Sequence, residues 1–201
     1  VMLQSGRLQT VIEHTRRARR LFRAAGSRSG TALCDNLAGE AARLAGDHAG
    51  AEAAYRAALR TWERLGLSYA SFARANLGLI ALERGDPVAA TPLVESALQA
   101  FRDGGREAVA AQMLVALLPC RAAAADWAGF DAALADARRY VDATDMADLD
   151  MARMARYAGD LCARAGDPRR AETAWRFAAA QFDALGHQKS AEQVEALLAS
   201  R

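Results

Sequence analysis

Residues 85–105 read GDPVAATPLVESALQAFRDGG, and residues 166–186 read GDPRRAETAWRFAAAQFDALG. In each stretch the first glycine suits the left-handed position that ends a helix, and the aspartate suits the cap of the next one. The proline then falls in the first helical turn, where its missing N–H costs nothing. Apolar residues follow at intervals of three and four, the spacing of one helix face. Each stretch therefore predicts a turn followed by an amphipathic helix that a second glycine closes.

The same turn signal occurs twice more, at Gly46-Asp47 and at Ala125-Asp126-Trp127, so that the four aspartates lie 39, 40 and 41 residues apart. An apolar stripe follows each signal. The stripes are Ala51, Tyr55, Ala58, Trp62 and Leu65; Ala90, Val94, Ala97 and Phe101; Phe130, Leu134, Ala137 and Val141; and Ala171, Trp175, Ala178, Phe182 and Leu185. Upstream, Val11, Thr15, Ala18 and Phe22 form a fifth copy, closed by Gly26. Self-similarity at a fixed period is the signature of a helical repeat protein.

Partner helices are expected between the copies, over residues 30–45, 68–84, 106–124 and 147–165, with a last helix over 188–199. We therefore predict an all-α fold of about ten helices, arranged as a right-handed α-solenoid of antiparallel helical hairpins. The expected organisation is a single domain over 1–201. It comprises the orphan second helix of a partial repeat (1–26), repeats at 30–66, 68–105, 106–145 and 147–186, and a capping helix (188–199). The chain is also expected to be a fragment of a longer protein.

The small and aromatic residues of these hairpins resemble the tetratricopeptide repeat (TPR). The elements that carry the resemblance are Ala38-Gly39, Gly46-Asp47, Ala51, Tyr55 and Ala58; Leu77-Gly78, Gly85-Asp86, Ala90 and Ala97; and Ala158-Gly159, Gly166-Asp167, Ala171, Trp175 and Ala178. The long repeat of about 40 residues is similar to the variant found in bacterial signalling and transcription-regulator proteins. The resemblance implies a non-catalytic scaffold or sensor module that binds a protein or peptide and regulates an attached domain. The alternative that it leaves open is a regulatory receptor domain for a small-molecule inducer.

In TPR arrays the first helix of each hairpin lines the concave face. Carried over to this chain, the resemblance implies that eleven residues bind the partner: Asn36, Glu40, Arg43, Phe72, Asn76, Leu79, Gln112, Val115, Arg153, Arg156 and Asp160. The arginines among them favour a partner of acidic character. Glu40 stands where chaperone-binding members carry an asparagine, and Lys189 is the only lysine, so a clamp for a chaperone tail is not expected.

No residue pattern indicates catalysis. The sequence lacks a nucleophile–base pair, a phosphate-binding loop and a metal-ligand cluster, so we expect no enzyme activity and no cofactor. The histidines are expected to be solvated, and the three cysteines, which are far apart in sequence, to be buried thiols of a cytoplasmic protein. Asp145, Asp148 and Asp150 are interpreted as helix-capping residues and not as a cation site.

Charge is unevenly distributed. Residues 1–30 hold seven arginines against Glu13, a net charge of +6, whereas the other 171 residues carry −4. The arginine-rich residues 7–28 keep nucleic acid open as a partner, although a solvated helix face explains them as well. No membrane partner is expected, because no apolar stretch approaches the roughly 20 residues that span a bilayer.

Two further expectations concern packing. Trp62, Phe101, Trp175 and Phe182 should be buried between successive hairpins. Pro119 stands within a predicted helix, after Leu118, where it should kink or break the helix. Such a kink would make either a local groove or hinge, or a degenerate repeat whose defect is absorbed by packing.

Overall fold

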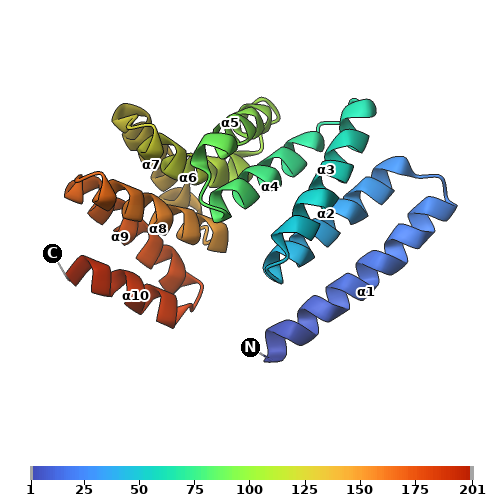
Figure 1. Ribbon diagram of the computed structural model, residues 1–201, viewed down its shortest axis with the longest axis horizontal. Coiled ribbons are helices and arrows are strands. Elements are labelled where there is room, and N and C mark those ends of the chain that lie inside the picture. Colours follow the sequence, from blue (N-terminus) through green and yellow to red (C-terminus); the bar gives the residue numbers. More distant parts are fainter. Residues whose placement is uncertain (1, 200–201) are drawn as a thin grey trace. The chain divides into compact units, whose positions relative to one another are not determined.

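The computed structural model describes the backbone of residues 2–199 and the side chains of residues 9–199. Val1, Ser200 and Arg201, the ends of the predicted 1–201 domain, lie outside the described residues, as does the side chain of Arg7. Within residues 2–199 every regular element is an α-helix, and there are ten of them (Figure 1). The prediction of an all-α fold with about ten helices is confirmed. The helices are α1 (Met2–Ala24), α2 (Arg28–Leu44), α3 (His48–Arg64), α4 (Ala70–Glu83), α5 (Pro87–Asp103), α6 (Glu107–Ala123), α7 (Trp127–Thr144), α8 (Leu149–Arg164), α9 (Pro168–Ala184) and α10 (Gln188–Ala199).

The four predicted turns fall where the sequence placed them. Asp47, Asp86, Asp126 and Asp167 each accept a hydrogen bond from the backbone N–H three residues ahead, over 2.8–3.0 Å. This bond satisfies one of the N–H groups that the first helical turn leaves without an intrahelical partner. In three of the turns a glycine precedes the aspartate with φ between +77° and +80°; in the fourth, Ala125 adopts φ +53°. Asp148 caps α8 in the same manner, accepting from the Met151 N–H over 2.9 Å, as its interpretation as a capping residue predicted.

The helices group into two compact units, residues 1–80 and residues 81–201, so that the boundary falls inside α4. The single domain and the repeat boundaries drawn from the sequence stay predictions.

In the first unit α2 packs against both α1 and α3. Its core is built around Trp62, which packs with small residues of α2, α3 and α4. Tyr55 is fully buried beside Gly39, where a Cβ atom would come within 2.6 Å of the tyrosine ring. A residue without a side chain is therefore needed on α2 for the aromatic ring of α3 to lie there.

The predicted apolar stripe of α1 is only partly buried. Thr15 is covered, but Val11 is 48% exposed and Phe22 is 37% exposed. The reason is that burial requires neighbours on both sides. Among the described residues of the first unit, α1 packs mainly on α2, and Val11 and Phe22, in the outer part of the stripe, are exposed.

In the second unit α6 is the central helix, packed by α5, α7 and α8, and every residue from Met113 to Cys120 is buried. α6 continues without a break from Glu107 to Ala123, so the break predicted at Pro119 is absent. The fully buried proline ring is held by its neighbours, and this packing offsets the hydrogen bond that the proline cannot donate. Phe101, Trp175 and Phe182 of this unit, like Trp62 of the first, are at most 4% exposed, which confirms the predicted core.

None of the described helices combines the length and apolar character that a bilayer crossing needs.

Candidate functional site

Six of the eleven predicted partner-binding residues lie in the first unit, on α2 and α4. Two of them bond to one another across the two helices: Asn76 Nδ2 donates to Asn36 Oδ1 over 3.2 Å. Asn36 Nδ2 in turn donates to Glu40 Oε1 over 3.1 Å. Because Asn36 is buried, this ladder satisfies polar atoms that would otherwise lie unpaired in the interior. Leu79 is buried as well, whereas Arg43 and Phe72 are half-buried.

The remaining five predicted residues lie in the second unit, on α6 and α8. Val115 is fully buried, and its side chain contacts neighbouring helices and not solvent. Gln112 Nε2 donates to Asp148 Oδ2 over 3.0 Å, and the Asp148 backbone N–H donates to Gln181 Oε1 over 2.9 Å. This network holds the start of α8 in place. The amide group of Gln112 is thus engaged within the fold.

Arg153, Arg156 and Asp160 of α8 are the predicted residues that the structure brings together around one cavity. Its volume is about 310 Å³, within the range of roughly 300–1,000 Å³ that is typical of ligand sites. We call it the α8 pocket. Its lining comprises Leu149, Arg153, Arg156, Tyr157, Asp160, Phe182, His187 and Ser190.

The α8 pocket is formed where α8 and α9 pack together and α10 packs on α9. Arg153, Arg156, Tyr157 and Asp160 are spaced at three, one and three residues along α8, so they share one side of that helix. Phe182 belongs to α9, and His187 lies in the turn before α10. The Phe182 and His187 ring centroids are 6.4 Å apart, so these two rings form an aromatic side of the pocket.

Positive charge prevails in the α8 pocket. Arg153 is held only loosely, with its NH1 3.9 Å from Asp150 Oδ1 and its side chain 45% exposed. Arg156 NH1 donates to Gln193 Oε1 over 3.2 Å, a neutral partner that leaves the guanidinium charge uncompensated at that bond. The one carboxylate of the lining, Asp160, accepts a hydrogen bond from Trp175 Nε1 over 3.0 Å.

Tyr157 adds a neutral phenol to this lining. Burial raises the pKa of its hydroxyl, and the Arg164 charge opposes that shift only in part. The phenol therefore stays protonated at neutral pH and can donate a hydrogen bond. Taken together, the pocket offers two guanidinium groups and the aromatic rings of Tyr157, Phe182 and His187, a combination suited to an acidic group carried on an apolar body.

Sequence reasoning missed five residues of the lining: Leu149, Tyr157, Phe182, His187 and Ser190. Tyr157 could have been found, because it follows Arg153 by four residues and so lies on the same helix face. His187 and Ser190 could not have been found from the sequence, because only the turn from α9 into α10 brings them close to α8. His187 was expected to be solvated, and it is half-buried against Phe182.

No protein-family model matches the chain. No curated protein matches it in sequence either. Solved structures do match. BtubC (BKLC) from P. vanneervenii is similar at a TM-score of 0.59 and 16% identity, over 96% of this chain and 93% of BtubC. A Rap protein, solved in complex with Competence and Sporulation Factor, is similar at a TM-score of 0.63 and 16% identity, over 94% of this chain. This chain spans 57% of the Rap protein's length. The fold is an α-solenoid-like helical repeat, as these structures share it with the present chain.

Proposed function

We propose that this chain is a non-catalytic binding module that holds an acidic segment of a peptide or protein partner, with the α8 pocket as the principal contact. The observation that carries the proposal is the convergence of Arg153 and Arg156 on one cavity. A guanidinium presents its donors as a planar fork that matches a carboxylate, so two of them favour Asp or Glu side chains.

One structural neighbour supports this class of function. The Rap protein was solved with Competence and Sporulation Factor bound to it, so a helical repeat of this architecture binds a partner there. The other eight predicted residues, on α2, α4 and α6, stay predictions, and three of them, Asn36, Leu79 and Val115, are buried. The proposal also extends to a regulatory effect of binding on an attached domain in a bacterial cytoplasm.

Direct measurement of peptide binding tests the proposal. A set of fluorescent peptides of equal length, acidic, neutral and basic, would be titrated with the chain and followed by anisotropy. We expect the acidic peptides to bind best. Replacing both Arg153 and Arg156 by alanine should weaken that binding more than tenfold, about 1.4 kcal/mol, without a comparable change in melting temperature.

The matched control is Arg176→Ala, because Arg176 is an exposed arginine of α9 that pairs with Glu172 and does not line the pocket. The double variant Arg16→Ala/Arg20→Ala tests the competing site, the basic face of α1. Binding that is lost only in the Arg16/Arg20 variant would place the interface on the basic α1 face and would refute the α8 pocket. Equal affinity for acidic and basic peptides would refute the proposed partner class.

A specific observation also favours the second candidate function, a receptor for a small inducer. A cavity of about 270 Å³ lies between α1 and α2, lined mainly by Ile12 and the alanines 38, 41, 42 and 45. Such a lining would take an apolar molecule. Ala42→Leu should fill the cavity and abolish binding of a small apolar ligand, while leaving acidic-peptide binding unchanged.

A further inference from the structure

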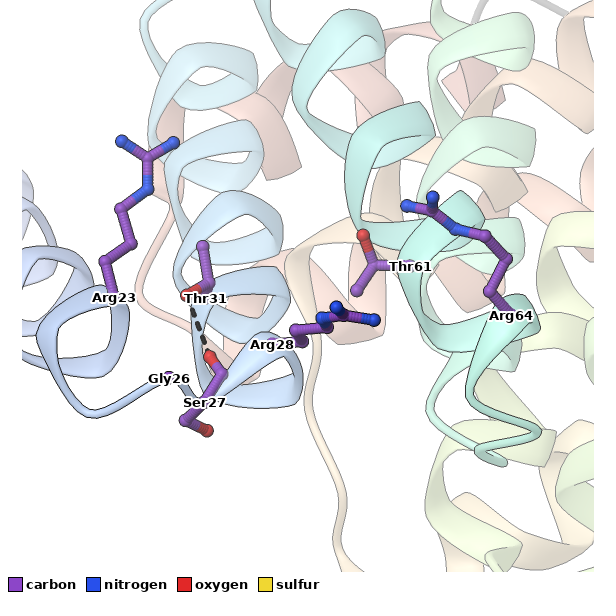
Figure 2. Close-up of a pocket in the computed structure, with 7 residues that line it drawn as sticks. All are labelled: Arg23, Gly26, Ser27, Arg28, Thr31, Thr61 and Arg64. Atoms are coloured by element: carbon purple, nitrogen blue, oxygen red, sulfur yellow. Dashed lines mark hydrogen bonds between the residues drawn. The ribbon is translucent and has the colours of Figure 1, made fainter.

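A further cavity of the first unit lies outside both of these sites. Its volume is about 450 Å³, and it opens where α1 turns into α2, against the last turn of α3. Seven residues line it: Arg23, Gly26, Ser27, Arg28, Thr31, Thr61 and Arg64 (Figure 2). We call it the arginine pocket. In Figure 2 the Arg28 side chain extends toward Thr61 and Arg64 on α3, and Arg23 stands on α1, beyond Thr31.

The hydrogen bonds of the lining decide which groups it offers to a ligand. The Thr31 hydroxyl donates to the Ser27 carbonyl over 2.9 Å, and the Thr61 hydroxyl donates to the Ala57 carbonyl over 3.0 Å. Both threonines have therefore used their protons within their own helices. Ser27 Oγ accepts from the Gly30 N–H over 3.2 Å and keeps its own proton for another partner.

The guanidinium groups are the main donors of the arginine pocket. Arg64 uses its Nε to bond the Arg60 carbonyl over 3.1 Å, which leaves its two terminal nitrogens for a ligand. Within the described residues, neither Arg23 nor Arg28 has a carboxylate partner. Arg19, one turn before Arg23 on the same helix, shows the contrast, because it pairs with Asp35 over 2.6 Å.

Charge in the arginine pocket is accordingly unbalanced. Its lining contains three arginines and no acidic residue. The N-terminus of α2 opens at the same place, and its peptide dipoles add further positive potential. The three arginines are exposed, so water screens their mutual repulsion, and their positive potential attracts an anion. An anion of more than one charge, rich in acceptor oxygens, compensates this set best.

We propose that the arginine pocket binds a phosphate-bearing small molecule, with a diphosphate group as the preferred anion. A single carboxylate brings one negative charge and two oxygens, whereas a diphosphate brings several charges and oxygens that the guanidinium forks of Arg28 and Arg64 can share. The threonine oxygens, which can only accept, suit hydroxyl groups on the remainder of such a molecule. This inference concerns residues that the proposed peptide site does not use.

Calorimetric titration of the full chain tests the inference, with inorganic pyrophosphate, inorganic phosphate and a nucleoside diphosphate as probes at constant ionic strength. We expect pyrophosphate to bind at least tenfold more tightly than phosphate. Arg28→Ala and Arg64→Ala should each weaken pyrophosphate binding at least tenfold. Tighter binding of the nucleoside diphosphate than of pyrophosphate would show that the larger molecule is the preferred source of the group.

The matched control is Arg60→Ala, which removes an exposed arginine one turn before Arg64 on α3 without changing the lining. It should change the affinity less than twofold. Equal losses of pyrophosphate affinity in Arg28→Ala and Arg60→Ala would overturn the inference. They would show that pyrophosphate binds to a diffuse basic surface and not to the arginine pocket. Binding of double-stranded DNA that all these arginine variants weaken alike, with no pyrophosphate binding, would overturn it in favour of nucleic acid.

Discussion

At the scale of single residues, the three cysteines are governed by burial. Cys34, Cys120 and Cys162 are at most 3% exposed, and all three are unpaired thiols. Burial raises the pKa of each, because a thiolate is poorly solvated in an apolar interior, and it raises the pKa of Cys162 to about 11. The thiolate is the reactive form, so these groups are chemically quiet in the folded chain.

The burial of the three thiols predicts that they are alkylated slowly in the folded chain. At pH 8 the thiolate fraction of a group with a raised pKa is smaller than that of an ordinary cysteine, and it grows as the pH rises toward the pKa. We expect the folded chain to incorporate almost no iodoacetamide at pH 8, and the chain in concentrated urea to incorporate three equivalents, as counted by mass spectrometry. Rapid labelling of Cys162 without urea would contradict the buried environment described for it.

The candidate site could be predicted from the sequence only where its residues share one helix. Arg153, Arg156 and Asp160 lie together because helical spacing places them so, and spacing is visible in the sequence. The same rule predicts Asn36 as a site residue, yet Asn36 is buried and accepts a hydrogen bond from Asn76 of another helix. The sequence does not state how deeply such residues are covered, because coverage depends on the packing of separate helices.

At the scale of helices and turns, local chemistry explains why the elements were predictable. An aspartate cap and a left-handed glycine act over three or four residues, so Gly85-Asp86-Pro87 specifies its turn without help from the rest of the chain. The exposure of Val11 and the unbroken path of α6 through Pro119 depend on neighbouring helices and were not predictable in this way.

Ala125 is the turn residue that departs from the rule. It is exposed, and it holds a left-handed conformation with φ +53° that glycine adopts more readily. Ala125→Gly should therefore stabilise the chain by roughly 1 kcal/mol, as measured by urea unfolding. Ala124→Gly is the control: Ala124 caps α6 at φ −87°, so glycine gains nothing there and should be neutral or destabilising. Stabilisation by both changes would refute the conformational explanation.

Core truncation tests the packing of α5. Phe101 is 1% exposed, so Phe101→Ala removes a buried ring and leaves a cavity that the surrounding helices can fill only in part. We expect a loss of about 3–5 kcal/mol in the free energy of unfolding, from denaturant titration. Val88→Ala on the same helix is the control, since Val88 is 79% exposed and its loss should cost less than about 0.5 kcal/mol. A comparably small loss for Phe101→Ala would mean that this ring is not part of the core.

At the scale of the whole molecule, the two units are both helical but differ in the sign of their net charge. Residues 1–80 hold twelve arginines against six acidic residues, a net charge of +6, and residues 81–201 carry −4. The arginine pocket lies in the basic unit. The α8 pocket is a local positive site in a unit of opposite net charge. An anion is therefore drawn to the first by both the unit and the pocket, and to the second by the pocket alone.

The two proposed sites share no lining residue, and each is built within its own unit, so they should bind their ligands at the same time. We expect the dissociation constant of an acidic peptide, measured by anisotropy, to change less than twofold when pyrophosphate saturates the chain. Sodium chloride at matched ionic strength is the necessary control, because added salt screens every exposed charge. Arg28→Ala should weaken pyrophosphate binding at least tenfold and spare the peptide, and Arg153→Ala/Arg156→Ala should weaken peptide binding more than tenfold and spare pyrophosphate. If pyrophosphate displaces the peptide beyond the effect of salt, and a single set of arginine variants weakens both ligands, the chain has one anion site. The assignment of separate ligands to the two units would then be wrong.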